Sequence, residues 1–182
     1  MAEPPLPWAL VESSPLVDCV VFQVARDRAC SPRTGREHDF YRIEATDWVN
    51  VVPVTPAGDI VLVRQYRHGA RRATLEIPGG MVDPGETPAE AAVRECLEET
   101  GYGGGEVSRL GCVNPNPALF GNRCHTFLLE GVVPVGEIQN EGSEETQVEV
   151  LSPDQLDARV ASGEIDHALV IAALFWWARA AR

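Results

Sequence analysis

Apolar and β-branched runs alternate with short turn sequences along most of the chain, and this pattern predicts strands. Residues 48–55 and 60–66 are two such runs, and the Pro- and Gly-containing segment 56–59 between them is typical of a tight turn. We expect these two runs to pair as core strands. Further strands are predicted at 107–113, 123–129 and 147–151.

Helical patterning begins after residue 87. Thr87 as N-cap, Pro88 at the first helical position, Glu90 closing a capping box and Gly101 as the stop predict a helix between them. Ser152-Pro153-Asp154-Gln155 repeats this start chemistry, and a last helix is predicted at about 166–179. Strands and helices mix without regular alternation, which favours an α/β sandwich over a doubly wound sheet.

The first 45 residues differ from the rest in their sequence pattern. Residues 17–24 and 38–43 are predicted to form two short strands around a loop at 26–36. A hairpin of this size cannot bury its own apolar face, so we expect it to need a partner surface. We therefore predict an N-terminal β-hairpin region at 1–45 and a main domain at 46–182.

Charge limits the classes of partner. The formal net charge is −12, with 27 acidic against 15 basic residues, which argues against binding to nucleic acid or to an anionic membrane. All 15 basic residues are Arg, so Schiff-base and phosphate-loop lysine chemistry are excluded. An anionic ligand must be bound by a local cluster of arginines.

The five cysteines are odd in number and form no C-x-x-C pair, which is typical of free thiols in a reducing compartment. The N-terminal residues lack a basic segment followed by an apolar one, and the apolar run 168–178 is short for a bilayer, which needs a helix of about 20 residues. We expect a soluble, cytoplasmic protein.

Three carboxylates share one face of the helix that starts after Thr87. Glu95, Glu98 and Glu99 lie at i, i+3 and i+4, a spacing at which like charges destabilise a helix by about 0.2–0.5 kcal/mol per pair. A bound cation would reverse this effect, and oxygen ligands at this density suit Mg²⁺ or Mn²⁺. Taken without their neighbours, three such glutamates are more often a solvated acidic face than a metal site.

The neighbours change this interpretation. Gly80, five residues, Glu86, seven residues and then Arg94-Glu95-Cys96-Leu97-Glu98-Glu99-Thr100-Gly101-Tyr102 resemble the Nudix box, G-x5-E-x7-R-E-U-x-E-E-x-G-U. All seven fixed positions match, while Cys96 and Tyr102 depart from the aliphatic U. The resemblance implies an α/β/α sandwich in which Glu95, Glu98 and Glu99 hold Mg²⁺ (Mn²⁺ is the alternative) and water attacks a diphosphate. It also implies that Glu86 supports the site and that Arg94 is its ion-pair partner.

The flanking residues resemble one branch of that family. Leu75-Glu76-Ile77-Pro78-Gly79-Gly80 is similar to the lead-in of the ADP-ribose and nucleotide-sugar pyrophosphatases, where the residue matching Gly79 gives a carbonyl to the metal. Residues 61–67 are similar to the strand of that branch that ends in Q-[YF]-R, whose Arg, here Arg67, contacts substrate phosphate. Residues 162–168 resemble the entry into its last helix. The branch implies a homodimer in which the N-terminal hairpin is exchanged.

A dense positive cluster supports a phosphate ligand, because guanidinium groups bind phosphate bidentately. Its members are Arg64, Arg67, His68, Arg71 and Arg72. The resemblance implies that aromatic residues such as Trp48 stack a base, although core packing remains an alternative for each. The candidate substrate-binding residues are Arg67, Arg64, Trp48, Arg42 and Glu76.

A second acidic segment precedes the strand predicted at 147–151. In the resembled branch a loop at this place supplies the glutamate that orients or deprotonates the nucleophilic water. Counting back from Ser152 selects Glu144 as catalytic residue and further metal ligand, with Glu145 and Glu141 as alternatives. If none of the three serves, Glu98 on the helix is the next candidate for this catalytic role.

The sequence therefore predicts Mg²⁺-dependent hydrolysis of ADP-ribose or another nucleoside diphosphate sugar to a nucleoside monophosphate and a sugar phosphate. Two alternatives stay open. One is a Nudix hydrolase of dinucleoside polyphosphates, nucleoside triphosphates or coenzyme A, and the other is a non-catalytic domain that senses ADP-ribose.

Overall fold

The computed structural model describes residues 4–140 and 145–180. The elements in chain order are β1 (Ala9–Asp18), β2 (Gln23–Cys30), β3 (Glu37–Glu44), β4 (Trp48–Val54), β5 (Ile60–Arg67), β6 (Arg72–Glu76), α1 (Pro88–Thr100), β7 (Tyr102–Val113), β8 (Cys124–Pro134), β9 (Thr146–Leu151), α2 (Pro153–Ala161) and α3 (Ala168–Ala180). The chain divides into two compact units. The N-terminal unit is Met1–Thr46 with Asn114–Asn122, and the larger unit is Asp47–Val113 with Arg123–Arg182.

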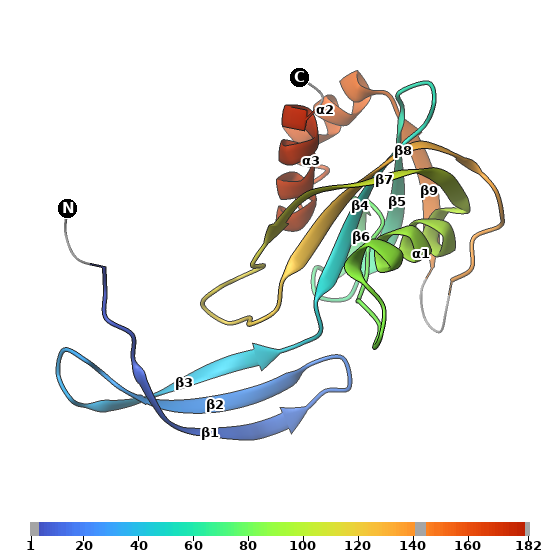
Figure 1. Cartoon of the computed structure of the whole chain (residues 1–182). Helices are drawn as coiled ribbons and strands as arrows, with labels where there is room; N and C mark the ends of the chain where they lie inside the picture. Colours follow the sequence, from blue (N-terminus) through green and yellow to red (C-terminus); the bar gives the residue numbers. More distant parts are fainter. Residues whose placement is uncertain (1–3, 141–144, 181–182) are drawn as a thin grey trace. The chain divides into compact units, whose positions relative to one another are not determined.

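The larger unit is built on a mixed sheet with strand order β6-β5-β4-β8-β7, and β9 pairs with β5. β4 and β8 run parallel, and the other neighbouring pairs are antiparallel. Figure 1 shows α1 on one side of this sheet and α3 on the other, and both helices contact β4 and β7. The predicted α/β/α sandwich is confirmed.

Strand alternation divides the apolar residues between two cores. On β4, Val49 and Val51 pack on the α1 side, whereas Val52 and Val54 pack on the α3 side. The α1-side core also contains Val61, Ala91, Ala92, Cys96, Phe127, Leu129 and Val132. Because successive side chains of a strand point to opposite faces, the position of a residue in β4 or β5 determines which helix it meets.

Helix α1 begins and ends where its caps predict. The Thr87 hydroxyl accepts a hydrogen bond from the Glu90 N–H (3.3 Å), and the Glu90 carboxylate accepts one from the Thr87 N–H (2.8 Å). Gly101 has φ 71°, a left-handed conformation that glycine adopts without strain, and its N–H donates to the Leu97 carbonyl. Helix α2 has the same capping box at Ser152.

Helix α3 is the most apolar helix of the chain but has 13 residues. Among the helices of residues 4–140 and 145–180, none combines the length and the apolar character that crossing a membrane requires.

In the N-terminal unit, β1, β2 and β3 form an antiparallel sheet. A hairpin is present as β2 and β3, but the loop expected at 26–36 was wrong in part because residues 26–30 belong to β2, and β1 adds a third strand that was not predicted. The strand expected at 17–24 was wrong: β1 ends at Asp18, and residues 19–22 form the turn, with Val20 at φ 70°. The Asp18 carboxylate accepts a hydrogen bond from the Val20 N–H (2.9 Å), which stabilises a conformation that β-branched residues rarely adopt.

Residues 114–122, which connect β7 to β8, group with this N-terminal sheet rather than with the strands they join. The Ile43 N–H donates to the Leu119 carbonyl (2.8 Å), and Ile43 pairs with Phe120 in an isolated parallel bridge. The N-terminal unit is thus made of two separate segments of the chain.

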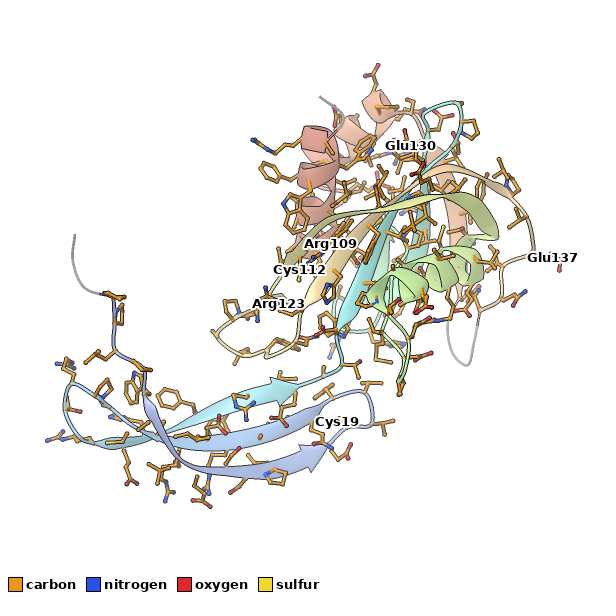
Figure 2. The ribbon with its side chains drawn as sticks, in the orientation of Figure 1. Cys19, Arg109, Cys112, Arg123, Glu130 and Glu137 are labelled. Carbon is orange, nitrogen blue, oxygen red and sulfur yellow. The ribbon has the colours of Figure 1, made fainter. Side chains whose placement is uncertain are left out.

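All five cysteines are free. Burial raises the pKa of the Cys96 thiol to about 11 and that of Cys124 to about 12, whereas Cys19 is exposed in the turn after β1 (Figure 2). The two buried thiols act as small core residues, which agrees with the predicted absence of disulfides.

Candidate active site

A cavity of about 1010 Å³ lies within the larger unit, on the side of the sheet that α1 covers. Five kinds of group line it: charged side chains of α1, the backbone around Gly79, residues of β4, side chains of β5 and β6, and residues just before and at the start of α3. They include Trp48, Asn50, Gln65, Arg67, Arg72, Thr74, Glu76, Gly79, Gly80, Arg94, Glu95, Glu98, Glu99, Asp166 and His167.

Arg94 lies at the centre of the acidic wall. Its Nε and Nη2 each donate to a different oxygen of Glu86 (both 3.0 Å), and its Nη1 donates to Glu95 (2.9 Å) and Glu98 (3.0 Å). The hydrogen bonds from Arg94 hold the pKa of Glu86 below its usual range, and those to Glu86 raise the pKa of Arg94. The ion pair between Arg94 and Glu86 that the sequence motif implies is therefore present.

Glu99 is the most buried of the three carboxylates on this face of α1, with 5% of its surface exposed. Its Oε2 accepts a hydrogen bond from the Gly79 N–H (3.0 Å), which joins α1 to the segment that follows β6. Glu95, Glu98 and Glu99 thus line the same cavity, as their spacing on a helix predicts.

Two consecutive glycines let the backbone pass close to this wall. A Cβ atom on Gly79 would lie 2.3 Å from the Val49 carbonyl oxygen, and one on Gly80 would lie 2.2 Å from Oε1 of Glu95. Both distances are far inside van der Waals contact. Glycine at both positions therefore leaves the space in which Glu95 and the 79–80 backbone approach each other.

The donor chemistry of this wall fits a hard divalent cation. The side chains are carboxylates, which Mg²⁺ and Mn²⁺ prefer, and Gly80 leaves the space around the Glu95 oxygens open. Within residues 4–140 and 145–180 no three His, Cys, Asp or Glu side chains converge closely enough to hold a metal ion. The reason is visible in the contacts, because Arg94 takes an oxygen of Glu95 and of Glu98 while Glu99 accepts from Gly79.

Opposite the carboxylates, Glu76 and Arg67 form a bidentate ion pair. Nε and Nη2 of Arg67 donate to the two oxygens of Glu76 (3.0 and 2.8 Å), and the Thr74 hydroxyl donates to Oε1 of Glu76 (2.6 Å). Nδ1 of His167 lies 3.1 Å from Oε2 of Glu76, close enough for an ion pair but outside hydrogen-bond angles. Burial acts to raise the pKa of Glu76, but His167 and Arg67 outweigh it and hold this pKa well below its usual range.

The candidate substrate-binding residues do not all meet here. Trp48, Arg67 and Glu76 line the cavity, but Arg64 does not. Arg64 instead bonds Glu149 (2.6 Å) and Glu164 (2.8 Å), because strand alternation turns it to the opposite face of β5 from Arg67. Arg42 belongs to the N-terminal unit, where it pairs with Asp27 and Glu44.

The predicted water-orienting glutamates fall at the margin of the described chain. Glu144 and Glu141 lie outside the described residues. Glu145 is exposed and directly precedes β9. The choice among the three therefore stays a prediction.

Sequence reasoning gave no role to the two residues before α3, Asp166 and His167. Both line the cavity, and both pair with side chains of β6: Asp166 with Arg72, and His167 with Glu76. No local spacing signal marks them, since their partners lie far away in the sequence.

Comparison with known protein families identifies this arrangement. Residues 46–174 match the model of the NUDIX domain, which is more than half of the chain. The chain belongs to the Nudix family. The acidic face of α1 is accordingly the Nudix box of this domain.

Two relatives of this Nudix chain are named as ADP-ribose pyrophosphatases. The one from Bacillus subtilis is 36% identical over 110 residues, which cover 60% of this chain and 59% of the relative. The one from Mycobacterium tuberculosis is 29% identical over 167 residues, which cover 89% of this chain and 79% of the relative. The match to the Bacillus protein thus spans less than two thirds of that relative.

A solved structure described as an ADP compounds hydrolase has the same fold. It superposes with a TM-score of 0.85 and covers 98% of this chain and 96% of its own, at 20% sequence identity. At this identity the likeness shows the fold of the Nudix chain and not its substrate.

Gly79→Ala tests the close approach of the backbone. The added Cβ would meet the backbone oxygen of Val49, which cannot move aside easily, so we expect the free energy of unfolding to fall by about 1–3 kcal/mol in urea titration. Gly69→Ala is the matched control, since a Cβ there has no neighbour within 4 Å, and it should change stability by less than about 0.5 kcal/mol. Equal stability of the two variants would show that the segment at Gly79 is not constrained.

Proposed function

We propose that this Nudix protein hydrolyses the diphosphate of ADP-ribose, or of another nucleoside diphosphate sugar, to a nucleoside monophosphate and a sugar phosphate with Mg²⁺ as cofactor. One observation carries the proposal: a single cavity has the acidic face of α1 on one wall and the Arg67–Glu76 pair on another. Carboxylates suit a divalent cation and guanidinium suits phosphate, and a diphosphate with its metal needs both.

The names of the relatives support this substrate class. Besides the two ADP-ribose pyrophosphatases, a mouse relative that is 38% identical over 78 residues is named ADP-sugar pyrophosphatase. A Bacillus subtilis relative that is 41% identical over 81 residues is named putative 8-oxo-dGTP diphosphatase, so nucleoside triphosphates belong in the substrate panel.

Each wall has its own part in the mechanism. Arg67, whose plane is fixed by Glu76, binds and orients the diphosphate, while Glu95, Glu98 and Glu99 would hold the cation together with the Gly79 carbonyl. When bound, the divalent cation supplies neutralisation of phosphate charge and raises the acidity of a water molecule. Arg94 keeps Glu86 in place through two hydrogen bonds, so that the other carboxylates would be the ones to bind the cation.

The nucleophilic water needs a base on the side of the diphosphate away from the leaving group. Glu144, from the loop before β9, is our candidate for aligning and deprotonating this water and for completing the metal ligands. Glu141 and Glu145 are its alternatives, and Glu98 on α1 follows if no loop glutamate serves.

The exposed apolar side chains of the N-terminal sheet support a homodimer. Apolar side chains remain exposed on both faces of this sheet, because strand neighbours such as Phe40 and Tyr41 point to opposite sides. They include Trp8, Leu10, Leu16, Val17, Phe40 and Tyr41. An exposed apolar surface of this kind is typical of a protein interface. We propose that a second copy of the chain covers it.

The preferred substrate and the need for a metal ion can be tested together. With Mg²⁺, purified protein should release AMP from ADP-ribose faster than it cleaves nucleoside triphosphates, diadenosine polyphosphates or coenzyme A, as measured by chromatography. EDTA should abolish the activity and added Mg²⁺ should restore it. Full activity in chelator would contradict the metal mechanism, and a preference for another panel member would reject the substrate.

Glu99→Gln separates the metal role from a structural one. The amide oxygen can still accept the Gly79 hydrogen bond, so the fold should remain, but loss of the charge should lower turnover by roughly 10²–10³-fold, the several kcal/mol that a catalytic cation supplies. Glu106→Gln, at an exposed position of β7, should leave both stability and turnover near those of the wild type. A Glu99→Gln variant with normal turnover would remove Glu99 from the metal site.

The loop glutamates are to be compared in a single assay. Glu144→Gln should lower kcat by roughly 10²–10⁴-fold with little change in KM, because a base acts mainly in the transition state. Glu141→Gln and Glu145→Gln should stay close to the wild type. A large fall in either of these instead would move the base to that residue, and three active variants would point to Glu98.

Introducing charged side chains on the N-terminal sheet tests whether this sheet forms the dimer interface. Sedimentation of the wild type should give about twice the chain mass of 19.8 kDa. Leu10→Glu combined with Phe40→Glu places two charges on the exposed apolar surface and should give a monomer. Val150→Glu, on an exposed position of β9 in the larger unit, is the control and should remain dimeric. A double variant that keeps twice the chain mass would remove this sheet from the interface.

A further inference from the structure

The β5–β6 hairpin that carries Arg67 has an electrostatic conflict built into its pairing. Arg67 lies directly opposite Arg72 in the strand register, and like charges at such a position destabilise a hairpin. Each arginine is neutralised by a carboxylate, Arg67 by Glu76 and Arg72 by Asp166. The conflict is thus resolved by two acidic residues, one from β6 and one from the start of α3.

The start of α3 contacts this hairpin through two consecutive residues. Asp166 pairs with Arg72, and Nδ1 of the next residue, His167, lies 3.1 Å from Oε2 of Glu76. β6 is the last strand in the order of the sheet. The hairpin is therefore held by the pairing of β5 with β9 and by these side-chain contacts from the segment before α3. Asp166 and His167 therefore connect the two ends of β6, Arg72 beside the turn and Glu76 at the far end, to the segment before α3.

Glu76 is the buried centre of the arrangement. Its side chain is 3% exposed, and a buried carboxylate is tolerated only where donors surround it. Thr74 and Arg67 supply donors from the same hairpin, and His167 supplies the contact from another layer of the fold. Because two N–H groups of Arg67 face Glu76, the orientation of this carboxylate sets the plane of the guanidinium.

The orientation of the imidazole fits this role. Nδ1 of His167 is buried against Glu76, while the side chain as a whole is 40% exposed and lines the cavity. We propose that His167 is a positioning residue for the diphosphate: it fixes Glu76 and, through Glu76, directs the guanidinium of Arg67 to the phosphate. The inference rests on the proposed function for the identity of the substrate, but not for the contact itself.

Two conservative variants of His167 distinguish a contact made by Nδ1 from a contact made by Nε2. The side-chain nitrogen of Asn reaches the place of Nδ1, whereas that of Gln reaches the place of Nε2. If His167 acts through Glu76, His167→Asn should keep the affinity for pyrophosphate and the KM for ADP-ribose close to those of the wild type, and His167→Gln should not. The reverse order would indicate that the exposed edge of the ring contacts the substrate directly.

The measurements use the full chain and two probes. The first is the Kd of inorganic pyrophosphate with Mg²⁺, by calorimetry, and the second is kcat and KM for ADP-ribose with Mg²⁺. His167→Ala should weaken pyrophosphate binding by about 10-fold, the usual effect of a residue that orients a ligand-binding group, and should raise KM similarly with little change in kcat. His167→Asn should recover most of both.

A matched control comes from the other histidine–carboxylate contact. Nε2 of His125 lies 3.0 Å from Asp47, and neither residue is among those that line the cavity. His125→Ala should therefore lower thermal stability without changing the Kd of pyrophosphate. A loss of affinity in this control equal to that of His167→Ala would reduce the role of His167 to general stability and overturn the proposal.

The remaining outcomes decide between the role of His167 and the proposed function. Unchanged pyrophosphate affinity in His167→Ala overturns the proposal, as does recovery by Gln but not by Asn, or a wild type that binds no pyrophosphate. A wild type that binds pyrophosphate but leaves ADP-ribose intact rejects the proposed function alone. In that case the pyrophosphate series still supports or overturns the role of His167.

Discussion

The guanidinium of Arg94 pairs with two of the three carboxylates on the acidic face of α1 and with Glu86, and the site depends on how it divides its hydrogen bonds. Nε and Nη2 of Arg94 serve Glu86, and Nη2 also reaches the Met81 carbonyl, whereas Nη1 serves Glu95 and Glu98. Without this charge, three carboxylates at i, i+3 and i+4 would repel one another along the helix. The contacts to Glu86 are therefore made by different nitrogen atoms of Arg94, apart from the shared guanidinium plane, than the contacts to Glu95 and Glu98.

The parts of the fold that depend on local chemistry could be predicted from the sequence. The caps of α1 are set by residues within one turn of its ends, so Thr87, Glu90 and Gly101 sufficed to place both ends. The turn after β1 could not be placed in this way. Val20 and Val21 are typical of a strand, but the Asp18 carboxylate and the pairing of β1 with β2 hold Val20 in a left-handed conformation. There the tertiary pairing outweighs the residue preference.

The same distinction applies to the site. Glu95, Glu98 and Glu99 come from one helix, so spacing alone places them together. Arg64 and Arg67 are three apart on a strand, and an odd separation puts them on opposite faces, which pattern reasoning could have used to separate them. The contact between Glu76 at the end of β6 and His167 just before α3 joins residues far apart in the sequence, and no periodicity in the sequence predicts it.

Residues 114–122 belong to the N-terminal unit, but the chain on either side of them belongs to the larger unit. The two units are therefore covalently joined through this loop as well as between Thr46 and Asp47. This loop leaves and re-enters the larger unit between β7 and β8, yet it is hydrogen-bonded to Ile43 at the end of β3. A protease that cut the chain once, between Thr46 and Asp47, would not thereby free the first 46 residues. The cleaved fragment would still be paired with a loop that belongs, by its backbone, to the rest of the molecule, so the nicked protein would migrate as one particle until it was denatured.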